Sequence, residues 1–224
     1  MLKALIFDFD GLILDTESPE ATVWTRIYAE HGFEFPFNDW VQTVGGYGIS
    51  SFNPAEHLSH LSQGRLDSAS MRLRHNDEST TIIERSSILS GVLEMIQQAK
   101  VHGLKLAIAS SSSHAWVDAH AKRLGIYHHF DKVICSDDVP AGRTKPNPDL
   151  YLLALDKLRV RKDEAVVFED SPNGVKAANR AGIFVVAVPN SITSKLKIEG
   201  ADLTVTSLAD LYLADLMHTV QLRY

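Results

Sequence analysis

From Ser87 onward, short apolar runs alternate with segments whose apolar residues have helical spacing. The runs show no alternation of polar and apolar residues, which is typical of parallel strands covered on both faces. We predict strands at Leu104–Ala109, Lys132–Ser136, Ala165–Phe168 and Ile183–Val188, and one more in the N-terminal run that ends at Phe7.

Three of the predicted helices between these strands end at a glycine. They cover Val92–His102, His114–Leu124 and Pro172–Ala181, and the glycines are Gly103, Gly125 and Gly182. Glycine directly after a helix readily adopts the left-handed conformation that ends it. A last helix is expected over Leu208–Leu222. This order predicts a doubly wound α/β fold with a parallel sheet, which binds ligands at the carboxyl ends of its strands.

The segment from Asp15 to Ser86 has helical spacing and no strand of comparable length. Helices are expected from Ser18-Pro19 to Gly32, over Pro54–Leu61 and over Asp67–Glu84, because Pro in the first turn and a polar cap favour helix starts. We predict a small all-helical domain of residues 15–86, inserted after the first strand. Residues 1–14 and 87–224 then form the α/β core, a division that suits 224 residues.

Composition narrows the function classes. Hydrophobic residues make up 45% of the chain, and the net charge of −6 argues against a nucleic-acid surface. No apolar run is long enough to span a bilayer, and the first strand begins too early to leave room for a signal peptide. Cys135 is the only cysteine, so an internal disulfide is excluded. We expect a cytoplasmic monomer without membrane or nucleic-acid partners.

The first strand ends in two carboxylates, Asp8 and Asp10, followed by Gly11. Residues two apart in an extended chain point the same way, so both acids can serve one site. Burying anions is costly without a compensating cation, which favours Mg²⁺ with oxygen ligands. One carboxylate can then attack an electrophile while the other transfers protons. Taken alone, the motif is also compatible with an ordinary acidic turn.

Three later segments add polar groups at strand ends. Ser110–Ser113 precede a helix, so their hydroxyls and the helix N–H groups suit a phosphate, although a serine-rich N-cap is the alternative. Lys145 precedes a helix that Asn147 is expected to cap and Pro148 to start; a lone loop lysine is otherwise a surface residue. Glu169 and Asp170 end a further strand and again suggest a metal.

These four segments, in this order and each at a strand end, resemble the haloacid dehalogenase superfamily. The likeness is to its branch of sugar-phosphate phosphatases and beta-phosphoglucomutases, and it covers nearly the whole chain. It includes Asp8-Phe9-Asp10-Gly11, Asp15-Thr16-Glu17, the Leu89-Ser90-Gly91-Val92 helix entry, Ser110, Lys145-Pro146 and Glu169-Asp170-Ser171 with Gly174. The helical insertion resembles the cap domain of this family, hinged near Thr16 and Ser87.

The resemblance implies magnesium-dependent hydrolysis of a small phosphomonoester, with a sugar phosphate as the expected substrate. Asp8 is then the nucleophile that forms an aspartyl-phosphate, and Asp10 is the general acid and base. Ser110, Ser111 and Lys145 would bind the phosphate. Four residues would form the metal site, with Asp10 contributing its backbone carbonyl: Asp8, Asp10, Glu169 and Asp170.

Alternative activities are weakened by particular residues. Beta-phosphoglucomutases carry a Gly-x-Ser-Arg stretch and a histidine in the cap, whereas this chain has no arginine in residues 45–50 and has Glu20 at the second position. Asp10 argues against a dehalogenase, and the lack of lysine in residues 15–86 argues against a phosphonate hydrolase. A non-catalytic binding module on the same fold is also weakened, because the closely spaced acids Asp8, Asp10, Glu169 and Asp170 would then have no function.

Other polar and aromatic residues are interpreted conservatively. His57 and His60 lack matched ligands, so a zinc site is not expected. We expect Trp24, Trp40 and Trp116 to be packing residues, although Trp40 could face the site. We expect Arg72, Arg74 and His75 to form a solvated helix face, although one of them could meet the substrate.

Overall fold

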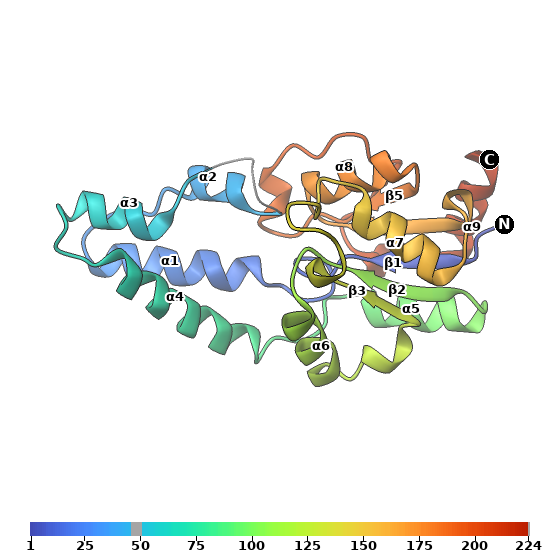
Figure 1. Ribbon diagram of the computed structural model, residues 1–224, viewed down its shortest axis with the longest axis horizontal. Helices are drawn as coiled ribbons and strands as arrows, with labels where there is room; N and C mark the ends of the chain where they lie inside the picture. The colour runs from blue at the N-terminus through green and yellow to red at the C-terminus, as the bar shows by residue number, and fades with distance from the viewer. Residues whose placement is uncertain (46–50, 224) are drawn as a thin grey trace.

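The protein is described by a computed structural model covering residues 1–45 and 51–223 (Figure 1). Its centre is a six-stranded sheet in the order β3-β2-β1-β4-β5-β6, and every pairing is parallel. The strands are β1 (Ala4–Phe7), β2 (Lys105–Ala109), β3 (Lys132–Ile134), β4 (Ala165–Glu169), β5 (Phe184–Ala187) and β6 (Leu203–Thr204). The predicted parallel sheet is confirmed. The two-residue β6 was not predicted, since it is too short to give a pattern.

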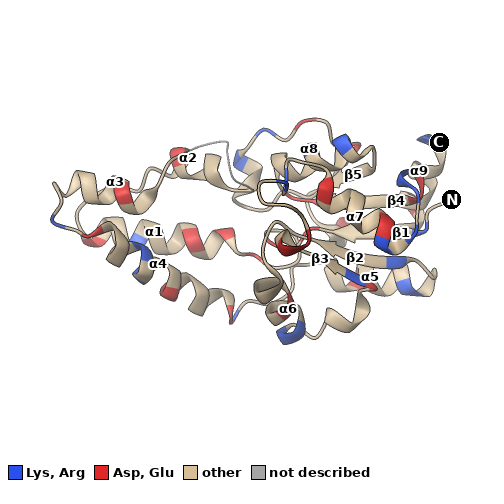
Figure 2. Cartoon of the chain, viewed as in Figure 1, with Lys and Arg blue, Asp and Glu red and all other residues tan. Residues whose placement is uncertain are grey.

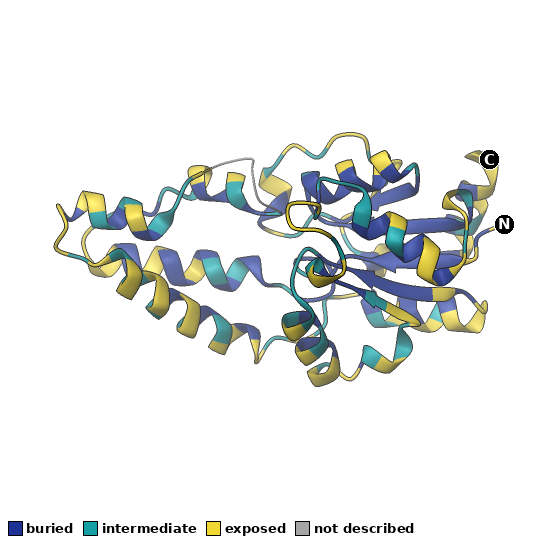
Figure 3. Cartoon of the chain, in the orientation of Figure 1, coloured by how far each residue is buried: buried dark blue, intermediate teal, exposed yellow. Residues whose placement is uncertain are grey.

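Helices cover both faces of the sheet, as Figure 1 shows. They are α5 (Val92–Val101), α6 (His114–Arg123), α7 (Asp149–Leu158), α8 (Pro172–Ala181) and α9 (Leu213–Arg223). Leu5 and Phe7 pack with α5, α6 and α9, whereas Ala4 and Ile6 pack with α7 and α8. Because successive strand residues point to opposite faces, all of β1 is buried (Figure 3). The predicted doubly wound core is therefore confirmed.

The register of the central strands places the sequence motifs side by side. Phe7 at the end of β1 lies opposite Ile108 of β2 and Phe168 of β4. The residues that follow these three, Asp8, Ala109 and Glu169, therefore lie side by side at the carboxyl ends of the strands, with Asp8 in the middle. This is the edge at which doubly wound folds bind their ligands.

In its described residues, the segment between β1 and α5 contains helices joined by loops and no strand of the sheet (Figure 1). It contains α1 (Glu17–Glu30), α2 (Phe37–Trp40), a 3₁₀ turn over Val41–Thr43, α3 (Pro54–Leu61) and α4 (Ser68–Ile83). These elements share a hydrophobic core of their own, which includes Trp24, Tyr28, Trp40 and Leu58. We call this helical segment the cap.

The two chain crossings into the cap lie beside each other. Leu14 forms an antiparallel bridge with Ile88, and the Leu89 N–H donates to the Ile13 carbonyl at 2.9 Å. This contact lies at the predicted boundary between a core of residues 1–14 and 87–224 and a cap of residues 15–86, and that division stays a prediction. No helix in the described ranges is long and apolar enough to cross a membrane. Monomeric state and cytoplasmic location stay predictions.

Some predicted helix ends were wrong. Helix α7 begins at Asp149, with Pro148 in the cap position, rather than at Pro148 with Asn147 as the cap. The Asn147 side chain instead donates to the carbonyls of Gly142 and Thr144 at 3.0 and 3.1 Å, so it stabilises the preceding loop. The last predicted helix is broken at Leu211, which is extended, so α9 begins only at Leu213.

Candidate active site

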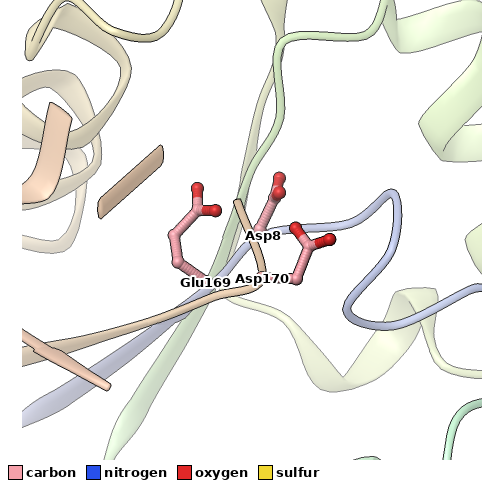
Figure 4. A group of neighbouring side chains, drawn as sticks. All are labelled: Asp8, Glu169 and Asp170. Carbon is pink, nitrogen blue, oxygen red and sulfur yellow. The ribbon is translucent and has the colours of Figure 1, made fainter. Parts of the chain in front are cut away.

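Asp8 continues β1 toward the edge of the sheet. Its N–H donates to the Phe168 carbonyl at 3.0 Å, so the backbone holds the residue in line with the strand. Glu169 and Asp170 end the neighbouring strand β4, and oxygens of all three side chains lie within 4.8 Å of one another. Figure 4 shows the three carboxylates projecting from the ends of the two strands. The sheet therefore gathers three buried anions at one point.

Lys145 lies between two of these carboxylates. Its Nζ is 2.5 Å from Asp8 Oδ1 and 2.7 Å from Glu169 Oε1. The lysine side chain is only 3% exposed. Burial acts to lower the pKa of Lys145, but the Asp8 and Glu169 carboxylates outweigh it and the pKa is raised. Lys145 is therefore a permanent cation, and the surface-lysine interpretation is wrong.

One lysine does not balance three acids. Burial, and then the Glu169 carboxylate, raise the pKa of Asp8 to about 7 despite the opposing effect of Lys145. Burial also raises the pKa of Asp170, with Glu17 and Asp8 adding to the shift. The cluster thus has the charge imbalance that a further cation relieves.

The carboxylate oxygens that accept no hydrogen bond in this cluster are suitable ligands for a hard cation. In the described residues, Asp8 Oδ2 and Asp170 Oδ1 accept no hydrogen bond, while Asp8 Oδ1 and Asp170 Oδ2 are used by Lys145 and Asn190. Carboxylate oxygens without donors are the ligands that Mg²⁺ prefers. The residues therefore fit a magnesium site. The role of the Asp10 backbone carbonyl in it stays a prediction.

Both oxygens of Glu169 are already engaged. Oε1 contacts Lys145 and accepts from the Tyr151 hydroxyl, and Oε2 accepts from the Ser171 hydroxyl at 3.2 Å. The start of α8 packs so closely here that a Cβ on Gly174 would lie 1.8 Å from the carboxylate. Glu169 therefore holds Lys145 in place, whether or not it also contacts a metal. Tyr151 was not found from the sequence, because nothing near it forms a motif.

The Asp10 carboxylate points toward the start of α6. It accepts from Ser112 Oγ at 2.7 Å and Ser110 Oγ at 3.3 Å on Oδ2, and from Trp116 Nε1 at 2.8 Å on Oδ1. Asp10 is not part of the close carboxylate group, but it lines the same cavity as Asp8. Trp116 was interpreted as a packing residue, and that interpretation was incomplete. Ser112 was not singled out either.

The serine segment offers polar groups that are not used internally. Ser111 Oγ is buried and has no hydrogen-bond partner, and the residue lines the cavity beside Ser110. Ser113 occupies the N-cap position of α6, but its side chain makes no capping bond. The N-cap alternative for the segment is therefore wrong. An unsatisfied buried hydroxyl costs free energy unless a ligand completes it, which suits a phosphoryl oxygen.

These groups line a cavity of about 970 Å³ between the core and the cap. Its cap wall includes one face of α1 and one face of α4, together with residues 43–45 and 51–54; the helix residues are Glu17, Glu20, Trp24, Arg72, His75 and Asn76. Burial is the main cause that raises the pKa of Glu17, and it raises that of Glu20 to about 7, with the Asp10 charge adding in both cases. Figure 2 shows acidic residues along the part of α1 that approaches the sheet.

Asn190 links the cap hinge to the acidic cluster. Its Nδ2 donates to Asp170 Oδ2 at 2.9 Å, to the Gly11 carbonyl at 3.1 Å and to Glu17 Oε2 at 3.3 Å. The residue follows β5, so the sheet also positions this amide. Asn190 was missed in the sequence, because the Pro-Asn-Ser context predicts only a turn.

The predicted helix face of α4 divides in two. Arg74 pairs with Glu30 and Glu78 at 2.7 and 2.8 Å on the outer surface. Arg72 and His75 line the cavity instead, and the His75 ring stacks on Trp24 with centroids 4.2 Å apart. The interpretation of His75 as solvated, and of Trp24 as packing alone, is therefore corrected, whereas the Arg72 side chain is 52% exposed, as expected of a solvated residue. Trp40 is buried in the cap core, outside the residues that line the cavity.

His57 has a partner within the cap, and the absence of a zinc site there stays a prediction. His57 Nδ1 is within hydrogen-bond distance of the Tyr28 hydroxyl, at 2.9 Å. In the described chain, the only residues close enough together to hold a metal are Asp8, Glu169 and Asp170. The predicted Gly45 to Ser50 stretch, used to weigh the mutase alternative, lies outside the described residues from Gly46 onward.

Comparisons with known proteins agree with this arrangement. A family model described as haloacid dehalogenase-like hydrolase matches residues 5–188. The chain belongs to this haloacid dehalogenase-like hydrolase family. The match spans every motif segment found in the sequence, from β1 to the strand after α8.

Two curated relatives and one solved structure illustrate the similarity. YhcW of Bacillus subtilis is 40% identical, with 97% of each chain covered. The fructose-1-phosphate phosphatase YqaB of Escherichia coli is 32% identical, covering 82% of this chain and 95% of that protein. The crystal structure of CbbY from Rhodobacter sphaeroides in complex with phosphate has a TM-score of 0.72 at 27% identity and covers 97% of this chain and 100% of that one.

Proposed function

We propose that the protein is a magnesium-dependent phosphatase that hydrolyses a small phosphomonoester through an aspartyl-phosphate on Asp8. The observation that carries the proposal is the arrangement around Asp8. Lys145 holds one oxygen of Asp8, the other oxygen has no donor among the described residues, and the same cavity is lined by a serine whose buried hydroxyl also lacks a partner. A carboxylate oriented in this way is suited to attack phosphorus.

Lys145 orients the attacking carboxylate and neutralises part of its charge. Because Lys145 Nζ holds Oδ1 at 2.5 Å, the carboxylate is fixed in its orientation toward the phosphorus atom that it attacks. The Glu169 carboxylate, which accepts from the Tyr151 hydroxyl, also pairs with the lysine and holds it in place. Preorganised charge of this kind stabilises a transition state without the cost of rearrangement.

Mg²⁺ would be held by Asp8 and Asp170, close to Glu169, together with the Asp10 backbone carbonyl. When bound, it offsets the repulsion between the anionic nucleophile and the anionic phosphate. Asn190 fixes the Asp170 side chain by its hydrogen bond to Oδ2, so that Oδ1 is presented to the cation. The close approach of Gly11 to Asp170 keeps this carboxylate against the β1 loop.

Asp10 would donate a proton to the leaving oxygen and later take one from the attacking water. Its carboxylate lies beside Ser110, so it can reach an oxygen of a phosphate ester bound at the serine segment. Ser110, the hydroxyl and N–H of Ser111, and Lys145 would bind the phosphoryl oxygens as charge spreads over them. The start of α6 adds the positive end of a helix.

The cavity and the relatives support a proposal for the substrate class. A cavity of about 970 Å³ has room for an organic group of sugar size beyond the phosphate. The cap wall offers hydrogen-bonding groups rather than a purely apolar surface. The fructose-1-phosphate phosphatase named among the relatives acts on a substrate of this kind. We propose a phosphorylated sugar or similar small metabolite.

The test is a phosphate-release assay over a panel of sugar phosphates, nucleotides and glycolytic intermediates, with magnesium and with chelator. We expect phosphate release from at least one sugar monophosphate, and its loss in chelator. For glucose 1-phosphate, the product assay must also count glucose 6-phosphate. Free phosphate as the main product supports hydrolysis, whereas glucose 6-phosphate would indicate a mutase. Full activity in chelator would contradict the metal site.

A further inference from the structure

The Asp10 carboxylate is held from two sides by α6 and the segment before it. Ser112 Oγ donates to Oδ2 at 2.7 Å, and the Trp116 indole Nε1 donates to Oδ1 at 2.8 Å. Ser110 Oγ adds a longer contact of 3.3 Å to Oδ2. A carboxylate whose two oxygens are bound from different directions cannot turn about its Cβ–Cγ bond without breaking one of the short contacts.

Trp116 is itself fixed. It is the third residue of α6, where Ser113 occupies the N-cap position, and its ring packs edge-on against the buried His120 one turn later, with centroids 4.3 Å apart. It also lines the cavity, so it reaches Asp10 from the core and not from the cap. The Trp116 side chain has only two rotatable bonds, and its N–H does not titrate, so it is a rigid donor at every pH.

We propose that Trp116, together with Ser112, is a positioning residue for proton transfer by Asp10. This inference rests on the proposed function. An indole N–H donates and never accepts, so Oδ1 must keep a lone pair turned to Trp116 in both protonation states. Ser112 Oγ holds the other oxygen, Oδ2, so the two residues together fix the orientation of the carboxylate in the cavity.

The proposal has a consequence that packing alone would not produce. A poor leaving group, such as the alkoxide of an alkyl phosphate, needs the proton from Asp10 during P–O cleavage, whereas p-nitrophenolate leaves without it. Misplacing Asp10 should therefore lower kcat/KM for the alkyl phosphate and spare that for the aryl phosphate. The kcat/KM value reports steps up to the departure of the alcohol, before Asp10 acts as a base.

The experiment compares Trp116→Phe with the wild type on an alkyl sugar phosphate that the wild type hydrolyses and on p-nitrophenyl phosphate. General acid help is usually worth roughly 10²- to 10⁴-fold, so we expect at least about a tenfold loss of kcat/KM on the alkyl phosphate. On the aryl phosphate, a change below about threefold is expected. Trp40→Phe is the matched control, since it removes the same indole from the cap core and should change neither value.

Ser112 provides an independent pair of variants. Ser112→Ala should show the same selective loss, and Ser112→Thr, which keeps the hydroxyl, should restore much of the activity toward the alkyl phosphate. In an Asp10→Asn background, Trp116→Phe should cause no further loss, because the group that it positions is already gone.

Equal losses on both substrates for Trp116→Phe and Ser112→Ala, or losses that persist in full in the Asp10→Asn background, would overturn the positioning role. Absence of any change in these variants would overturn it as well. A wild-type protein that hydrolyses neither substrate would instead contradict the proposed function, so the two failures can be told apart.

Discussion

At the scale of single residues, Lys145 is the group on which the acidic cluster depends. It forms ion pairs with Asp8 and Glu169, and all three side chains are less than 10% exposed. Removing one partner of a buried ionic group is far more costly than removing a surface pair, because the remaining charge has neither water nor a counterion.

Lys145→Met should therefore abolish turnover and lower the free energy of unfolding by ~3–5 kcal/mol. Urea unfolding of both proteins at neutral pH in chelator measures the difference. Lys176→Met, at an exposed position on α8, is the control and should change stability by less than about 0.5 kcal/mol. If Lys145→Met lowered the free energy of unfolding by less than about 1 kcal/mol, then Lys145, Asp8 and Glu169 would not be charged as described.

Glu20 makes stability depend on pH. Burial, followed by the Asp10 charge, raises its pKa from 4.5 to about 7. Because the folded chain binds this proton more tightly than the unfolded chain, the contribution of Glu20 is fully present below pH 4.5 and is lost as the pH rises through about 7. The uncharged Glu20→Gln side chain avoids that loss.

We expect Glu20→Gln to be more stable than the wild type by ~1–3 kcal/mol above pH 7, with the lower end favoured because Glu20 is only half-buried. The two proteins should converge below about pH 5. Unfolding curves at several pH values in chelator measure this. A constant difference across the range would rule out the raised pKa.

Sequence reasoning reached the residues that form short motifs at strand ends and missed those that act across the fold. Asp8 and Asp170 could be selected because each directly follows an apolar strand, and Lys145 because it precedes Asn147-Pro148, where a helix start was expected. Trp116 contacts Asp10, which is 106 residues away in the sequence. Asn190 contacts Asp170, which is 20 residues away. Such contacts depend on which strands are neighbours, which a single sequence does not contain.

At the scale of elements, the loop after β1 depends on Gly11. Gly11 has φ of +78°, and a Cβ there would lie 2.3 Å from Asp170 Oδ2 and 2.8 Å from Asn190 Nδ2. Gly64 has the same φ of +78°, but a Cβ there would meet nothing within 4 Å. The two glycines thus share the backbone strain and differ in the contact with the acidic cluster.

Gly11→Ala should raise the magnesium concentration for half-maximal activity at least about tenfold. The added Cβ would displace Asp170 and its partner Asn190, and losing a hydrogen bond that orients a metal ligand typically costs that much metal affinity. Gly64→Ala should leave it unchanged while losing a similar stability of roughly 1 kcal/mol from the backbone. Magnesium titrations of phosphate release compare the two. Equal magnesium requirements would mean that Asp170 does not depend on this close approach.

Element prediction succeeded where local signals were strong. Helix α3 was predicted with the bounds that it has, because Asn53 caps it and Pro54 begins it. The short α2 was missed, since four residues give no periodic pattern. The start of α7 was misjudged because the Asn147 side chain can either cap a helix or bind the preceding loop. In the folded chain it donates to the Gly142 carbonyl of that loop.

At the scale of the whole molecule, side chains of the core and of the cap line one cavity. The core supplies Asp8, Asp10, the serine segment and Lys145, and the cap supplies a wall from α1 and α4. The parallel sheet and its inserted helices could be predicted from the pattern of apolar runs. The wall could not, because the faces that α1 and α4 turn to the core depend on how the cap is docked.

The central claim is that Asp8 carries the phosphoryl group during turnover. The most direct measurement is rapid acid quenching of the enzyme with magnesium and a ³²P-labelled sugar phosphate from the active panel, followed by peptide mapping. The account predicts acid-stable, hydroxylamine-sensitive label on the peptide that contains Asp8, and neither label nor turnover in a folded Asp8→Asn variant. Turnover by Asp8→Asn, or label on a different peptide, would contradict it.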